Sequence, residues 1–90
     1  MNSKNNLLMF YGQGCVHCEK MMPLVEQLEL EHGVSVQKLE TWQNTDNDDL
    51  RKKYDIANCD GVPYFFNTKT EKFICGEADY TDLIVWATAE

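Results

Sequence analysis

Two cysteines separated by two residues, Cys15 and Cys18, are the residues of this chain best suited to chemistry. Two thiols at this spacing can close on each other, exchange with another disulfide, or share a metal ion. Only a thiolate attacks a disulfide, so the surroundings of the pair decide what it does. His17 lies between the cysteines, where an imidazolium would favour the Cys15 thiolate. The alternative for His17 is a solvent-exposed residue in the first turn of a helix.

The segments on either side of the pair predict a strand and a helix. Leu7–Tyr11 is a short continuous apolar run, which predicts a strand buried on both faces. Apolar residues recur with helical spacing over Glu19–His32, and Gly33 follows as a helix-ending residue. The first turn of this helix would begin at or next to Cys15. The positive end of the helix dipole would then stabilise a Cys15 thiolate.

The next segments extend this unit. Val34–Glu40 is rich in β-branched residues and predicts a second strand. Strand, helix and strand in this order imply a right-handed parallel crossover. Thr45 or Asp46 is predicted to cap a polar helix that ends at about Tyr54, with Leu50 and Tyr54 on its buried face.

The C-terminal third predicts a hairpin and a helix. Gly61–Asn67 and Lys72–Gly76 are expected to form antiparallel strands, and Asp79 is expected to cap the last helix. The order βαβαββα predicts one α/β domain over residues 1–90, with a mixed four-stranded sheet flanked by helices.

Composition limits the classes of function. The 90 residues are 43% hydrophobic and 26% charged, as in ordinary globular domains. The net charge of -7 argues against nucleic-acid binding, which needs clustered Lys and Arg. The apolar run near the N-terminus is too short for a signal peptide or a membrane span, so we expect a cytoplasmic protein without membrane contact. In a reducing compartment, four cysteines indicate catalysis or metal binding.

A Cys-x-x-Cys between a strand and a helix of a βαβ unit is typical of a thioredoxin-like redox site. The whole chain resembles the thioredoxin superfamily. Cys15–Cys18, with the sequence CVHC, follows the first strand, and Pro23 lies where thioredoxins have a helix-kinking proline. Gly61–Pro63 resembles the active-site loop in which the family has a cis peptide bond before proline, and Gly76 matches the small residue that closes the substrate groove. The size is closer to the shorter, glutaredoxin-like members.

The resemblance implies a thioredoxin-like fold and a thiol-disulfide oxidoreductase that acts on protein disulfides. Cys15 would be the attacking nucleophile and Cys18 the resolving thiol, with His17 tuning the pair. No cofactor is implied. The partners would be protein disulfide substrates and a recycling reductase or oxidase, and a monomer is expected. The expected substrate-binding residues are Gly14, Val16, Val62, Pro63 and Gly76.

The chain also departs from the thioredoxin pattern. Gly14 replaces the aromatic residue that usually precedes the first cysteine, and Val16 replaces the common Pro or Gly. Met9 lies where thioredoxins bury an Asp. Lys38 matches a buried thioredoxin lysine, and without that Asp its partner would be Glu40, Glu19 or water.

Cys59 and Cys75 are additional cysteines expected to flank the same groove. Three interpretations remain: a disulfide that clamps the proline loop, two inert buried thiols, or a second redox relay. Among the nearby aromatic residues, Phe65, Phe73 and Trp86 are expected in the core, whereas Trp42 and Tyr64 are candidates for an exposed rim.

Other functions were weighed against the oxidoreductase. In a metal-binding module, Cys15 and Cys18 would bind zinc or an iron-sulfur cluster with Cys59 or His17, but the chain has no second Cys-x-x-Cys or spaced His pair. A glutathione-dependent glutaredoxin fits the size but lacks basic residues for the carboxylates of glutathione. A binding-only, chaperone-like domain would not need an intact cysteine pair. The sequence leaves the direction of electron flow open.

Overall fold

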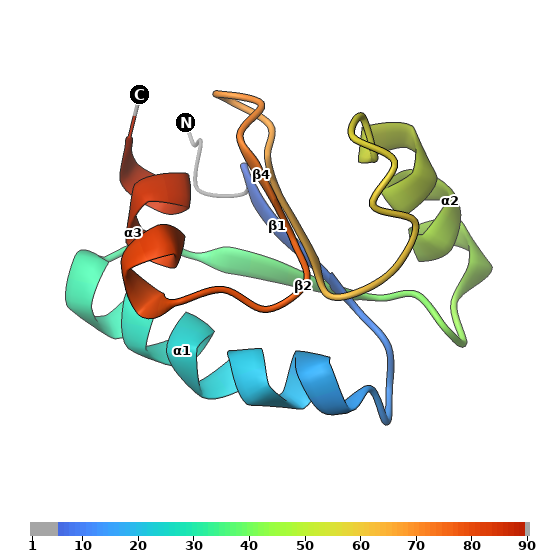
Figure 1. Ribbon diagram of the computed structural model, residues 1–90, viewed down its shortest axis with the longest axis horizontal. Coiled ribbons are helices and arrows are strands. Elements are labelled where there is room, and N and C mark those ends of the chain that lie inside the picture. The colour runs from blue at the N-terminus through green and yellow to red at the C-terminus, as the bar shows by residue number, and fades with distance from the viewer. Residues whose placement is uncertain (1–5, 90) are drawn as a thin grey trace.

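The computed structural model describes residues 6–89, in which three helices and four strands follow the predicted order (Figure 1). The elements are β1 (Leu7–Tyr11), α1 (Val16–His32), β2 (Val36–Glu40), α2 (Thr45–Tyr54), β3 (Tyr64–Asn67), β4 (Phe73–Cys75) and α3 (Tyr80–Thr88). The chain is therefore an α/β protein, as predicted.

The four strands form one mixed sheet in the order β2-β1-β3-β4. β1 pairs with β2 in parallel, whereas β3 is antiparallel to both β1 and β4. The parallel pair is joined through α1, because parallel neighbours need a crossover connection. The predicted four-stranded mixed sheet and its parallel crossover are confirmed.

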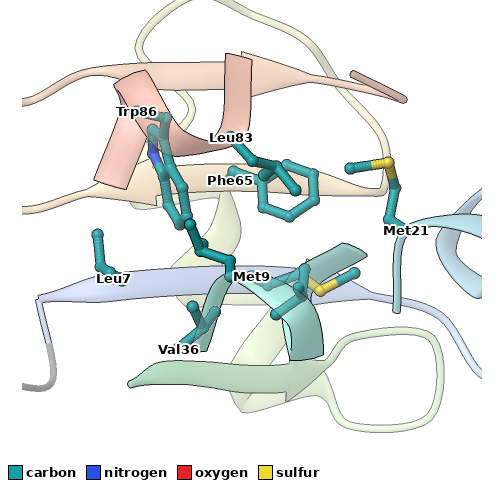
Figure 2. Packing of buried hydrophobic residues seen from close by; sticks show 9 residues of the cluster. Leu7, Met9, Met21, Val36, Phe65, Leu83 and Trp86 are labelled. Atoms are coloured by element: carbon teal, nitrogen blue, oxygen red, sulfur yellow. The ribbon is translucent and has the colours of Figure 1, made fainter. Parts of the chain in front are cut away.

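Both faces of the sheet are covered, which explains the continuous apolar run of β1. Leu7 and Met9 belong to a core cluster shared with α1 and α3, and Figure 2 shows this packing around Phe65, Leu83 and Trp86. Leu8 and Phe10 belong to a second cluster, on which residues of α2 pack. Figure 1 shows α1 and α3 on one side of the sheet and α2 on the other. Successive residues of a strand point to opposite faces of the sheet. The residues of β1 therefore pack into the two core clusters in turn, which is why the run is apolar throughout.

The helix ends agree with the expected chemistry at α1 but differ at α2 and α3. Asp79 lies at the N-cap of α3 as predicted, but its side chain makes no capping hydrogen bond. Gly33 ends α1 in the left-handed conformation, with φ of 64°, and its N–H donates to Glu29. Asn44, and not Thr45 or Asp46, caps α2, because its side chain accepts the N–H of Asn47. The strands are shorter than predicted: β2 begins at Val36, and Gly61–Pro63 lie outside β3.

Candidate active site

The loops that carry the cysteines and the proline leave the sheet at the same end of its strands. Phe10, near the end of β1, pairs with Tyr64 at the start of β3, and Tyr64 pairs with Cys75 at the end of β4. The segment after β1, the segment before β3 and the segment after β4 therefore begin side by side. This arrangement places the Cys15 loop, Pro63 and Gly76 at the same end of the sheet's strands, as the sequence predicted.

Cys15 occupies the N-cap position of α1. Its backbone is extended, with φ of -77° and ψ of 113°, and its Sγ accepts the N–H of Cys18 over 3.2 Å. Cys15 and Cys18 form a disulfide with their Cα atoms 5.2 Å apart. Cys15 is 5% exposed and Cys18 is 1% exposed, so Cys18 is the more enclosed of the two, as expected. The first N–H groups of a helix lack intrahelical partners, and here one of them faces the Cys15 sulfur.

Two glycines shape the loop between β1 and α1. Gly14 has a positive φ of 91°, which favours glycine, and Gly12 accepts the N–H of Cys15 over 3.0 Å. A Cβ atom on Gly12 would lie 2.2 Å from the indole of Trp42, so the ring packs directly on this backbone. The sequence signal for Gly12 is its place directly after the apolar run of the first strand, but no signal indicates the contact with Trp42.

The carboxylate of Glu40 ties this loop to the loop after β2. It accepts N–H groups from Gln13 at 2.9 Å, Trp42 at 3.1 Å and Gln43 at 2.9 Å. The hydrogen bond from Gln13 is the main cause that lowers the pKa of Glu40 below its usual value. The sequence suggests Glu40 only as a partner for Lys38, and it gives no sign that the carboxylate joins these two loops.

The expectation of a buried lysine is wrong. Lys38 is exposed and its Nζ lies 3.2 Å from the Glu29 carboxylate in α1. β2 is an edge strand, so the long side chain reaches water beside the helix. Glu29 also accepts the N–H of Val36, so it holds the start of β2 against α1.

His17 lies in the first turn of α1 with its side chain 67% exposed. Its Nδ1 hydrogen-bonds to the carboxylate of Glu77, which follows β4 and Gly76. This bond is the main cause of a lowered pKa at Glu77. Glu77 therefore determines where the imidazole lies, and sequence spacing gave no indication of this partner across 60 residues.

The proline loop has the predicted geometry. The Val62–Pro63 peptide bond is cis, and Pro63 is buried. The Pro63 carbonyl accepts the N–H of Gly76 over 2.8 Å, and Gly76 has a positive φ of 81°. Three of the five predicted substrate-binding residues are thus in one place. The other two, Gly14 and Val16, lie in the Cys15 segment, where Val16 is 61% exposed.

Cys59 and Cys75 form a second disulfide, with their Cα atoms 5.6 Å apart. This bond joins the loop between α2 and β3 to the end of β4, next to Gly76. Cys75 is exposed and Cys59 is half-buried. The structure therefore favours a bridged pair over the interpretation of two inert buried thiols.

A buried carboxylate holds the loop that contains Cys59. Asp55 accepts the N–H groups of Cys59 and Asp60, both over 2.7 Å. Its side chain is 9% exposed and pairs with Arg51, which is 8% exposed and also bonds to Asp48. A buried charge needs such partners. The sequence predicts only a polar helix that ends at about Tyr54, and nothing in its pattern indicates that Asp55 and Arg51 hold this loop.

The expectations for the aromatic residues are partly wrong. Phe65 and Trp86 are buried as predicted, and Trp42 is 59% exposed. Tyr64 is fully buried, not at an exposed rim, and its hydroxyl donates to the Tyr54 carbonyl over 2.6 Å. Burial raises the pKa of Tyr64 to about 12. Phe73 is 40% exposed because it lies on edge strand β4.

Searches against protein-family models and curated proteins find no match for this chain. Within residues 6–89, no group of three or more His, Cys, Asp or Glu side chains is arranged to hold a metal ion. In the same part of the chain, no helix is both long enough and apolar enough to cross a membrane.

Proposed function

We propose that this chain is a thiol-disulfide oxidoreductase of thioredoxin-like fold that acts on protein disulfides through Cys15 and Cys18. The observation that carries the proposal is the position of Cys15 at the N-cap of α1, with its sulfur accepting the Cys18 N–H. After reduction, the same N–H and the helix dipole would stabilise a Cys15 thiolate. Such a thiolate is the reactive form in disulfide exchange.

The reaction begins with attack of the Cys15 thiolate on one sulfur of the substrate disulfide. A bond forms between Cys15 and that sulfur, and the second substrate sulfur leaves as a thiolate. Cys18, after losing its proton, attacks Cys15 and closes the Cys15–Cys18 disulfide. The remaining substrate sulfur is released, and both substrate thiolates take up protons at neutral pH. The substrate gains two electrons and the cysteine pair loses two; the reverse sequence oxidises a substrate dithiol.

Exposure supports these roles. Both cysteines are buried, but Cys18 is the more enclosed, with 1% exposure against 5% for Cys15, as suits a thiol that attacks only within the chain. Val16 and Trp42 are exposed apolar side chains. Val16 follows the loop between β1 and α1, Trp42 lies in the loop after β2, and the Glu40 carboxylate joins these two loops. The two side chains offer apolar contact to a substrate chain at this end of the sheet's strands. Val62, Pro63 and Gly76 complete the proposed substrate-binding residues.

A trapping experiment tests the assignment of the two roles. Cys18→Ser in a Cys59→Ala/Cys75→Ala background should accumulate mixed disulfides between Cys15 and a disulfide-containing protein such as oxidised insulin. The matched control, Cys15→Ser in the same background, should trap far less. If trapping requires Cys18 instead, the roles are reversed. If the pair exchanges only with glutathione, the glutathione-dependent alternative replaces the proposal.

A further inference from the structure

The two disulfides of this chain differ in their access to solvent. Both sulfurs of the Cys15–Cys18 pair belong to buried residues, whereas Cys75 is exposed and its partner Cys59 is half-buried. Cys75 is the last residue of edge strand β4, which has a single neighbouring strand in the described chain. A thiol from another molecule therefore has more direct access to Cys75 than to the other three cysteines.

The backbone around the second disulfide is held by bonds that do not involve sulfur. On one side, the N–H of Cys59 bonds to Asp55, whose carboxylate is anchored by Arg51. On the other side, Cys75 pairs with Tyr64 in the sheet, and the next residue, Gly76, donates to Pro63. Opening the disulfide leaves these anchors in place. The two thiols would therefore stay close enough to close again.

We propose that Cys59–Cys75 is a second redox-active disulfide, which exchanges with protein dithiols through Cys75. A disulfide with a purely structural role would stabilise the fold most if the two segments that it links had no other attachment. Here both segments have their own attachments, and the more exposed cysteine of the pair, Cys75, lies on edge strand β4. This proposal does not depend on the function proposed for Cys15 and Cys18.

The exchange between Cys59–Cys75 and a partner dithiol has two steps. A thiolate of the partner dithiol attacks the Cys75 sulfur, a partner–Cys75 disulfide forms, and Cys59 leaves as a thiolate that takes a proton from water. The second partner thiol loses its proton and attacks the partner sulfur in the mixed disulfide. Cys75 then leaves as a thiolate and is protonated. The partner dithiol is oxidised by two electrons, and Cys59 and Cys75 become a dithiol.

The first test uses the full chain with Cys15→Ser/Cys18→Ser, so that only the second pair can react. The variant is incubated with dithiothreitol without denaturant, quenched with acid, alkylated and analysed by mass spectrometry. We expect two alkylated cysteines per chain, unchanged far-ultraviolet circular dichroism, and closure again on addition of oxidised dithiothreitol. A pair that opens only in denaturant, or a fold that is lost on reduction, would overturn the proposal. If this variant does not fold, the same counts at Cys59 and Cys75 are made by peptide mapping of the unaltered chain.

The second test identifies the sulfur that is attacked. The unaltered chain is exposed briefly to glutathione as a monothiol, and the mixed disulfides are mapped by mass spectrometry. Within the second pair, glutathione should be found on Cys75 about tenfold more often than on Cys59, because Cys75 is the more exposed residue. An equal distribution, or an excess on Cys59, would overturn the assignment to Cys75.

Discussion

The imidazole Nδ1 of His17 hydrogen-bonds to the carboxylate of Glu77, which joins the first turn of α1 to the segment after β4. One of the two residues between the cysteines is therefore tied to the segment that follows Cys75 and Gly76. The sequence predicts His17 beside the Cys15 sulfur, whereas in the structure the imidazole has a carboxylate partner. Any influence of His17 on the cysteine pair is exerted from this position.

The first prediction concerns the titration of Glu77. Because the bond from His17 is the main cause of its lowered pKa, Glu77 should titrate below the usual glutamate value. The stabilisation from this bond is present above the unfolded-state pKa and is lost as the pH falls through the folded value. His17→Ala should return the Glu77 midpoint toward its usual value, as measured by carboxyl ¹³C NMR. Lys20→Ala, which removes a weaker charge interaction, should move it less. An unchanged midpoint in His17→Ala would contradict the pairing.

The second prediction concerns Glu40, whose carboxylate joins the loops after β1 and β2. Glu40→Gln should lower the denaturation midpoint at neutral pH, because a neutral amide accepts the three N–H groups less well. The pKa of Glu40 is lowered, so its stabilisation is present above the unfolded-state pKa and lost as the pH falls through the folded value. The difference between the two proteins should therefore shrink in acid. Urea denaturation at pH 7 and pH 3 measures this.

The matched control for Glu40 is Glu26→Gln, at an exposed glutamate of α1. This variant should unfold at nearly the same urea concentration as the original chain at both pH values. If the two variants behave alike, the Glu40 carboxylate does not hold the loop.

The third prediction concerns the contact between Gly12 and Trp42. In Gly12→Ala the new methyl group would meet the indole at 2.2 Å, so the half-exposed ring must swing toward water. We expect a red shift of tryptophan fluorescence and a loss of about 1 kcal/mol in the free energy of unfolding. Gly61→Ala is the control, because its nearest neighbour lies 4.0 Å from the added atom. A red shift of the same size in Gly61→Ala would refute the contact.

The fourth prediction concerns Asp55, the anchor of the Cys59 loop. Asp55→Ala removes the acceptor for two backbone N–H groups and one partner of buried Arg51. The free energy of unfolding should fall by about 2 kcal/mol, because two backbone donors lose their acceptor and buried Arg51 loses one of its two carboxylate partners. Asp49→Ala, on the exposed side of α2, should cost much less. Equal losses in urea denaturation would show that Asp55 does not anchor the loop.

The sequence could predict the elements whose residues repeat with a regular period. The apolar run of β1 and the helical spacing in α1 report burial directly, and Gly33 marked the helix end. The Cys-x-x-Cys was placed at the start of α1 because the strand and helix on either side fix it there. The cis bond before Pro63 was anticipated only from the family resemblance.

The spacing of apolar residues gave wrong predictions of burial where burial depends on which helices cover a strand. All four residues of β3 are buried, because helices cover both faces of this inner strand, so Tyr64 is not at a rim. Phe73 pairs with Phe66, but it lies on edge strand β4, while α2 packs on β1 and β2. The same type of residue is therefore exposed on one strand and buried on the next.

The polar contacts of the site had no pattern in the sequence. Glu40 accepts an N–H from a residue 27 positions away, and Glu77 bonds to a residue 60 positions away. Such bonds depend on which loops the sheet brings together, and neither spacing nor composition records this. Asp55 was missed for a related reason, because its partners are backbone N–H groups that every residue type carries.

A redox titration of the Cys15–Cys18 pair tests the central claim most directly. A Cys59→Ala/Cys75→Ala variant is equilibrated in glutathione buffers of graded potential, alkylated, and counted by mass spectrometry. We expect a reversible two-electron transition between dithiol and disulfide. Its midpoint distinguishes a reductase, near the thioredoxin value of about -270 mV, from an oxidase at a markedly higher potential. Failure to form the Cys15–Cys18 disulfide under oxidising buffers, with a metal ion retained by the thiols instead, would contradict this expectation.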